Sequence, residues 1–167
     1  VWNQPIKGIN KLVITDIPAI VQKNITTEVD IDLKGYDGRT VLITAIIHLK
    51  GAKTIGVKVL KGTNEYTKVY LDGSSQELIV DRSKSGNVAF NENFLKISNS
   101  VSYTKNVIKL SILVDRSSVE VFDNDGGISI TSRVFPNSDA SAGVSVFAEG
   151  GTAFVELLNV APLKSIH

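Results

Sequence analysis

Two Asp-Arg pairs are the residues of this chain whose types and spacing best suit contact with a ligand. Asp81-Arg82 and Asp115-Arg116 each lie within the string Val-Asp-Arg-Ser, which occurs twice in the sequence. A guanidinium beside a carboxylate makes directional hydrogen bonds, so either pair can hold the hydroxyl groups of a sugar. The same side chains can instead join strand-to-turn corners through salt bridges and caps, because turn residues usually satisfy backbone groups first. We favour the structural interpretation and keep sugar binding by these four residues as the alternative.

Metal chemistry has weaker support in the sequence. Glu28, Asp30 and Asp32 lie on one face of an alternating segment, and calcium takes several oxygen ligands. Same-face residues of a strand are about 6–7 Å apart, so we expect a solvated face and no metal site. His48 and His167 form no recognisable metal pair. The chain has no cysteine, which excludes disulfides and thiolate sites, and no cofactor is expected.

Two further features concern carbohydrate. Asn24 opens an Asn-Ile-Thr sequon and is a candidate for N-glycosylation. Carbohydrate-binding modules often expose aromatic rings, and the candidates here are Tyr36, Tyr66, Tyr70 and Tyr103, because the one tryptophan, Trp2, lies near the start of the chain and outside the alternating strands. Tyrosines in alternating strands more often pack in a core or at its edge, so the aromatic evidence for sugar binding is weak.

Alternating apolar residues predict strands through most of the chain. Between 110 and 135 the alternation runs in three segments separated by turn sequences, which predicts a three-stranded antiparallel meander. Further strands are expected at 26–33, 41–49, 55–60, 66–71 and 77–81, together with one short helical turn. Turns about every 8–12 residues are typical of an all-β fold, a two-sheet antiparallel β-sandwich of jelly-roll or concanavalin-like type. We expect its core to bury Val114, Val119, Val121, Ile130, Val144, Val146 and Phe154.

Composition agrees with one folded domain and narrows the choice of partners. The chain has 167 residues, of which 43% are hydrophobic and 21% charged, as in ordinary globular domains. A net charge of +1 gives no field that would attract nucleic acid or an anionic membrane. No apolar run approaches the roughly 20 residues that a membrane-spanning helix needs. We therefore expect neither nucleic acid nor a membrane among the partners.

Several strings resemble a known family. VDRSKSG at 80–86, VDRSSVEVF at 114–122, SRVFP at 132–136 and AEGGT at 148–152 are similar to the C-terminal β-sandwich of glycoside hydrolase family 32, the invertases, inulinases and levanases. WNQPI near the start resembles the linker that leaves the family's catalytic propeller. The resemblance thus divides the chain into a linker-like segment, 1–12, and a sandwich domain, 13–167. Asp123 departs from the family, which commonly has a smaller or amide residue there, and as a turn residue it is expected to disturb little.

The resemblance implies a module without catalytic residues. The family's catalytic strings, WMNDPNG, RDP and ECP, do not occur in this sequence. Retaining hydrolysis of a glycoside needs two carboxylates about 5 Å apart, and no recognisable motif here supplies them. The expected partner is the catalytic β-propeller of a secreted enzyme acting on levan, inulin or sucrose, which the module would stabilise. The alternative is an autonomous fructan-binding module. A small enzyme or lectin unrelated to the family is disfavoured by the motifs.

Overall fold

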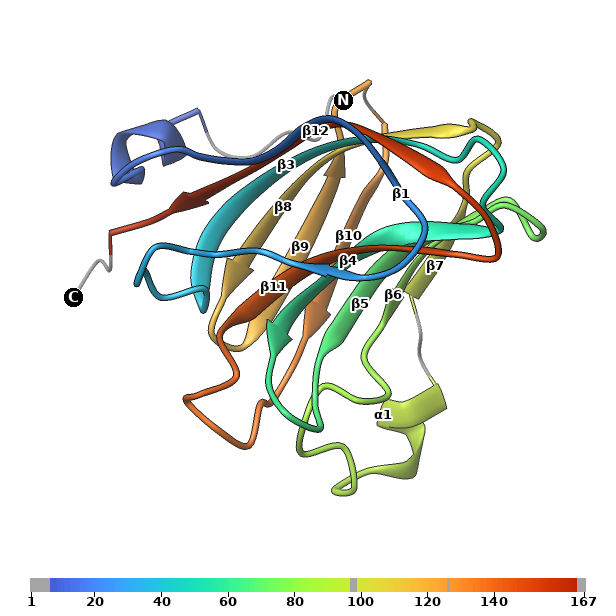
Figure 1. The fold of residues 1–167 in the computed structure, drawn as a ribbon. Helices are drawn as coiled ribbons and strands as arrows, with labels where there is room; N and C mark the ends of the chain where they lie inside the picture. The colour runs from blue at the N-terminus through green and yellow to red at the C-terminus, as the bar shows by residue number, and fades with distance from the viewer. Residues whose placement is uncertain (1–6, 97–98, 126, 165–167) are drawn as a thin grey trace.

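The computed structural model describes residues 7–96, 99–125 and 127–164, which form an almost entirely β structure (Figure 1). The strands are β1 (Ile17–Ile25), β2 (Val29–Asp30), β3 (Thr40–His48), β4 (Thr54–Lys61), β5 (Thr67–Asp72), β6 (Glu77–Asp81), β7 (Asn99–Ser102), β8 (Val107–Asp115), β9 (Ser118–Asp123), β10 (Ser129–Arg133), β11 (Gly143–Glu149) and β12 (Ala153–Pro162). A 3₁₀ turn, η1 (Ile9–Leu12), precedes β1, and a short helix, α1 (Glu92–Lys96), stands between β6 and β7.

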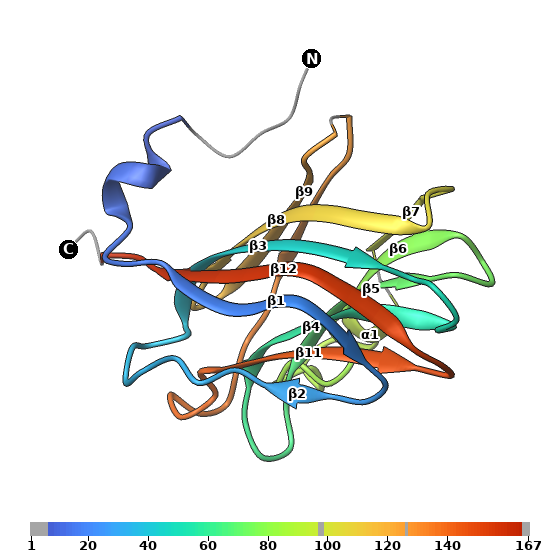
Figure 2. The ribbon, with the colours of Figure 1, turned by 45° about the horizontal axis from the view of Figure 1, so that its top comes forward.

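The strands form two antiparallel sheets that face each other (Figure 2). The first sheet has the order β1-β12-β3-β8-β9-β10, and the second has the order β2-β11-β4-β5-β6-β7. The chain changes sheet repeatedly, so strands close in sequence such as β3 and β4 belong to opposite layers. The two-sheet β-sandwich predicted from the alternation is confirmed, as is the meander, which is β8-β9-β10 in the first sheet.

The core lies between the sheets and is built by the period-two alternation of the strands. In β3 the residues Val41 and Ile43 are fully buried, and their register partners in β8, Val114 and Ile112, are fully buried as well. Of the residues expected in the core, Val114, Val119, Val121, Ile130, Val144 and Val146 are buried.

Phe154 is the exception among the expected core residues, because it is only half-buried. Its neighbours Ala153 and Val155 face the core, so the pleat turns Phe154 outward, where its ring centroid lies 5.6 Å from that of His48. The prediction of a buried Phe154 was therefore wrong by one strand position.

The expected strand at 26–33 is hydrogen-bonded as a strand only at Val29–Asp30. Its apolar face is nevertheless as predicted, because Val29, Ile31 and Leu33 are half-buried against the core. Beyond β2 a single backbone bond continues the pairing, in which Ile31 N donates to Val144 O at 2.9 Å.

The beginning of the chain is tied to its end. Trp2 and the WNQPI string lie outside the described residues. Leu12 accepts a hydrogen bond from Lys164 N at 2.8 Å, and Val13 forms an isolated bridge with Leu163. No helix of the described chain is both long enough and apolar enough to cross a membrane.

Candidate functional site

The first Asp-Arg pair forms a corner at the end of β6, and its two side chains point to different surroundings. Asp81 accepts a hydrogen bond from Ser83 N at 2.8 Å, which is the expected cap of a turn. Arg82 is only 9% exposed, donates from Nη1 to the carbonyl of Arg133 at 3.1 Å, and lies 3.8 Å from the ring centroid of Phe94. Burial lowers the pKa of Arg82. This arginine thus joins the second sheet to the end of β10 in the first.

The second pair occupies the tight turn between β8 and β9. Asp115 and Arg116 are both exposed, and Arg116 has a positive φ of 30°. The turn is fixed by its backbone, since Arg116 N donates to Arg39 O at 2.8 Å and Val134 N donates to Ser117 O at 2.9 Å. In the described structure no salt bridge joins the aspartate and arginine of either pair. The two corners lie at the same end of the sandwich, on either side of the chain at 133–134.

The three acidic residues considered for calcium are occupied by lysines. Glu28 lies 2.7 Å from the ammonium groups of both Lys58 and Lys61, and Asp30 also contacts Lys61. Burial by itself raises the pKa of Glu28, but hydrogen bonds from the two lysines and from Ser145 outweigh it and lower this pKa to about 2. Among the described residues there is no cluster of three or more potential metal ligands.

The tyrosines supply no free aromatic platform. Tyr103 is buried, its hydroxyl donates to Val107 O at 3.1 Å, and burial raises its pKa to about 12. Tyr66 and Tyr70 are half-buried, and lysine ammonium groups lie 4.5 and 4.6 Å from their ring centroids. Tyr36 is 39% exposed but stands in the loop before β3.

The remaining single-residue candidates are dispersed. His48 Nε2 lies 2.7 Å from Glu156 Oε2 on the outer face of the first sheet, and His167 lies outside the described residues. Asn24 is exposed near the end of β1, where its side-chain oxygen accepts a bond from Lys50 at 3.3 Å.

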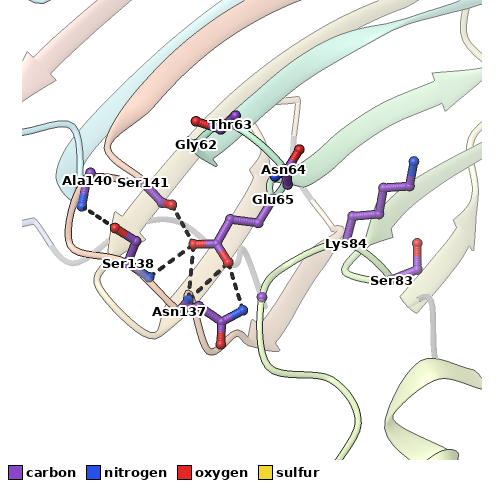
Figure 3. A pocket seen from close by; sticks show the side chains of 11 residues that line it. Gly62, Thr63, Asn64, Glu65, Ser83, Lys84, Asn137, Ser138, Ala140 and Ser141 are labelled. Atoms are coloured by element: carbon purple, nitrogen blue, oxygen red, sulfur yellow. Dashed lines mark hydrogen bonds between the residues drawn. The ribbon is translucent and has the colours of Figure 1, made fainter.

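An open pocket of about 850 Å³, lined mainly by polar residues, lies at the end of the sandwich near the two Asp-Arg corners. Figure 3 shows the side chains that line this polar pocket. Three loops line it: 62–65 between β4 and β5, 83–86 after β6, and 137–141 before β11. The loop at 83–86 is the second half of the VDRSKSG string. The strands predicted at 55–60 and 66–71 leave 62–65 between them, but nothing in the sequence spacing shows that this loop lies beside 137–141.

Glu65 orders one wall of this pocket. Its carboxylate accepts bonds from Asn137 N and Nδ2 at 3.0 and 3.1 Å, from Ser138 N at 3.2 Å, and from Ser141 Oγ. Burial alone raises the pKa of Glu65, but these donors prevail and lower it. Figure 3 shows the side chain of Glu65 pointing across to the loop at 137–141. Glu65 is therefore a bracing group in this pocket, already saturated with hydrogen bonds.

An aromatic cluster lies next to the pocket on two of the same segments. The rings of Phe90, Phe94 and Phe135 are 4.9 to 5.7 Å apart, and Phe90 and Phe135 are 57% and 36% exposed. The two segments are held together by Asn87 N, which donates to Phe135 O at 2.8 Å. Polar groups and an exposed apolar cluster thus meet at this end of the molecule.

The comparisons with known proteins identify the family. Residues 15–162 match the family described as "Glycosyl hydrolases family 32 C terminal". The chain belongs to this C-terminal family of the family 32 glycoside hydrolases. The resemblance seen in its sequence motifs is thereby confirmed.

The relatives are much longer than this module. A levanase from Bacillus subtilis is 42% identical over 117 residues, which cover 69% of this chain and 17% of the levanase. An extracellular exo-inulinase from Aspergillus awamori is 40% identical over 93 residues, covering 53% of this chain and 17% of the relative. The crystal structure of an exo-inulinase from that fungus has a TM-score of 0.76 at 25% identity, covering 98% of this chain and 32% of the other. Fructan 1-exohydrolase IIa from Cichorium intybus shares the fold, with a TM-score of 0.77 and 16% identity over 98% of this chain and 38% of its own. The chain therefore matches only the C-terminal part of these longer relatives.

Proposed function

We propose that this module is non-catalytic and stabilises the catalytic propeller of a secreted enzyme that hydrolyses fructans or sucrose. Its membership of the C-terminal family supports this function, as does the small share of the levanase that it spans. Secretion is supported by the extracellular exo-inulinase among its relatives.

The observation that carries the non-catalytic role is the state of the carboxylates. Three cations of the described chain each form ion pairs with two carboxylates; these cations are Lys61, Arg39 and Lys105. A glycosidase needs one carboxylic acid whose pKa is raised, so that it can protonate the leaving group. Wherever a carboxyl pKa departs clearly from its ordinary value in the described residues, it is lowered. These carboxylates suit ion pairing and loop bracing, and they do not suit general acid catalysis.

An assay of fructose release tests this part of the proposal. The purified chain is incubated with levan, inulin and sucrose beside a mock purification from cells that lack its gene. We expect both preparations to release the same background of fructose. Fructose release that rises with the amount of pure chain would overturn the non-catalytic assignment.

Fructan binding is the second candidate function, and one observation favours it. The polar pocket lies at the surface, and the side chains of Thr63, Asn64 and Ser83 in its lining form no hydrogen bond with any described residue. The four residues of the Asp-Arg pairs remain the earlier candidates for the same role. Arg82 is buried and hydrogen-bonded to the Arg133 carbonyl, so the pocket offers polar groups that are more accessible to a ligand.

A further inference from the structure

The pocket at the end of the sandwich has preordered walls. Its first and second loops are joined by Tyr66 N, which donates to Lys84 O at 2.7 Å. Its first and third loops are joined by Glu65, which accepts bonds from Asn137 and Ser138. A site whose backbone is already fixed loses little conformational entropy when a ligand binds.

The rim of the pocket carries polar groups that the described protein leaves free. Thr63, Asn64 and Ser83 are exposed, and their side chains form no hydrogen bond with any described residue. Lys84 makes no ion pair within the described chain, and its ammonium lies 5.8 Å from the ring centroid of Tyr66. Two hydroxyls, an amide and an ammonium thus point to a ligand with several donors and acceptors.

The charge of the pocket favours a neutral ligand. The carboxylate of Glu65 stays ionised, because its hydrogen-bond donors lower its pKa, and one ammonium, that of Lys84, belongs to the same lining, so the two formal charges cancel. A highly charged anion would meet a single cation, and a cation would meet no free carboxylate. A volume of about 850 Å³ lies within the range of about 300–1,000 Å³ that is usual for small-molecule sites.

The neighbouring aromatic cluster adds an apolar surface of the kind that carbohydrates use. Sugar rings combine hydroxyl edges with C–H faces, and exposed aromatic rings accept such faces. Phe135 stands two residues before Asn137, so the exposed rings begin where the polar lining ends. The same end of the sandwich therefore offers both kinds of contact.

We propose that this pocket binds a neutral carbohydrate, with the hydroxyls of one or two sugar units held by Thr63, Asn64, Ser83 and Lys84. The choice of a fructosyl unit as that sugar rests on the proposed function, whereas the carbohydrate class rests on the pocket itself.

The test is a titration of the isotope-labelled chain, followed by NMR, with a levan-derived trisaccharide and with cellotriose as the comparison sugar. We expect chemical shifts to move at residues 62–65, 83–86 and 137–141, with levan trisaccharide the stronger ligand. Asn64→Ala and Lys84→Ala should each weaken binding at least fivefold while leaving the melting temperature unchanged. The matched controls Asn106→Ala and Lys23→Ala, at exposed positions outside the pocket, should bind as the unaltered chain does.

Three results would overturn the proposal. One is no shift change with either sugar at concentrations far above those usual for sugar modules. Another is binding that maps to residues other than these three loops, or that survives both pocket variants. The third is sugar binding that is seen only after the chain is joined to a catalytic domain, together with protection of the pocket residues when no sugar is present. That result would make the pocket an interface with the catalytic domain. Equal binding of cellotriose would leave the carbohydrate class in place and remove the fructosyl assignment. None of these outcomes bears on fructose release, so the pocket and the proposed function fail separately.

Discussion

Glu28→Gln should destabilise the sandwich, because this carboxylate fastens the short strand β2 to its sheet. Its oxygens lie 2.7 Å from the ammonium groups of Lys58 and Lys61 and accept a bond from Ser145 Oγ at 2.7 Å. Glutamine has nearly the same shape, but it removes the negative charge and turns an amide N–H₂ toward a lysine. The side chain of Glu28 is only 31% exposed, so water compensates the loss incompletely.

The size of the effect follows from the pKa. The pKa of Glu28 falls from 4.5 to about 2 on folding, where burial opposes the fall and hydrogen bonds from the lysines and Ser145 produce it. At about 1.4 kcal/mol for each pKa unit, the ionised carboxylate contributes at most about 3–4 kcal/mol. Partial exposure screens such an interaction, so we expect about 1–2 kcal/mol at neutral pH. Because the pKa is lowered by folding, this stability is complete above about pH 4.5 and is lost as the pH falls toward 2.

The assay is urea unfolding followed by far-UV circular dichroism at pH 7 and at pH 3, in low salt. Asp32→Asn is the matched control, because its carboxylate is 71% exposed and pairs with an equally exposed Lys34. We expect a clear loss of unfolding free energy for Glu28→Gln at pH 7, a smaller loss at pH 3, and little change for the control.

Two results would refute this reasoning. Equal stability of Glu28→Gln and the unaltered chain at pH 7 would show that the lysine contacts contribute nothing. An unfolding midpoint that rises with added calcium in the unaltered chain, but not in Glu28→Gln, would instead restore the metal interpretation of this acidic face.

Four further substitutions separate structural contacts from surface ones, each measured as a change in unfolding free energy at pH 7. Arg82→Ala should lower the unfolding free energy by about 2–4 kcal/mol, because it removes a buried charged hydrogen bond and a contact with an aromatic ring. Arg116→Ala should change it by no more than about 0.5 kcal/mol. Equal effects of the two substitutions would show that burial does not distinguish the two corners. Asp123→Ala should cost about 1–3 kcal/mol, because this 1% exposed carboxylate accepts bonds from a lysine and from a backbone amide, and a neutral result would restore the view that it disturbs little. Gly86→Ala should cost about 2–4 kcal/mol, because φ is +115° and a Cβ would lie 2.3 Å from the carbonyl oxygen of Phe135; an unchanged melting temperature would contradict this packing.

The parts of the fold that the sequence predicts are those built on regular alternation. The segments at 41–49 and 77–81 match β3 and β6 closely, because each strand has one face against the core. β1 could not be predicted in the same way. It is an edge strand that contains Pro18, has a register shift beside it, and presents a mostly exposed run at 21–24.

The site was harder to predict than the fold, because its residues are distant in sequence. Glu65 and Asn137 are 72 positions apart, and only the sheet topology brings their loops together. Asp123 shows the same limit. Its place beside Asn-Asp-Gly-Gly suggested a turn residue, yet it closes β9 with its side chain buried beneath Lys105. Local spacing identifies turns, but it does not show which turn residues face inward.

The central claim is that this module stabilises a catalytic domain, and a chimera tests it most directly. In the chimera, this chain replaces the C-terminal 32% of the exo-inulinase to which it is structurally similar, and the truncated exo-inulinase without any sandwich is the comparison. Both are compared by melting temperature and by inulin hydrolysis. We predict that the chimera hydrolyses inulin and melts at a higher temperature than the truncated enzyme. A truncated enzyme that is as stable and as active as the chimera would contradict the stabilising role.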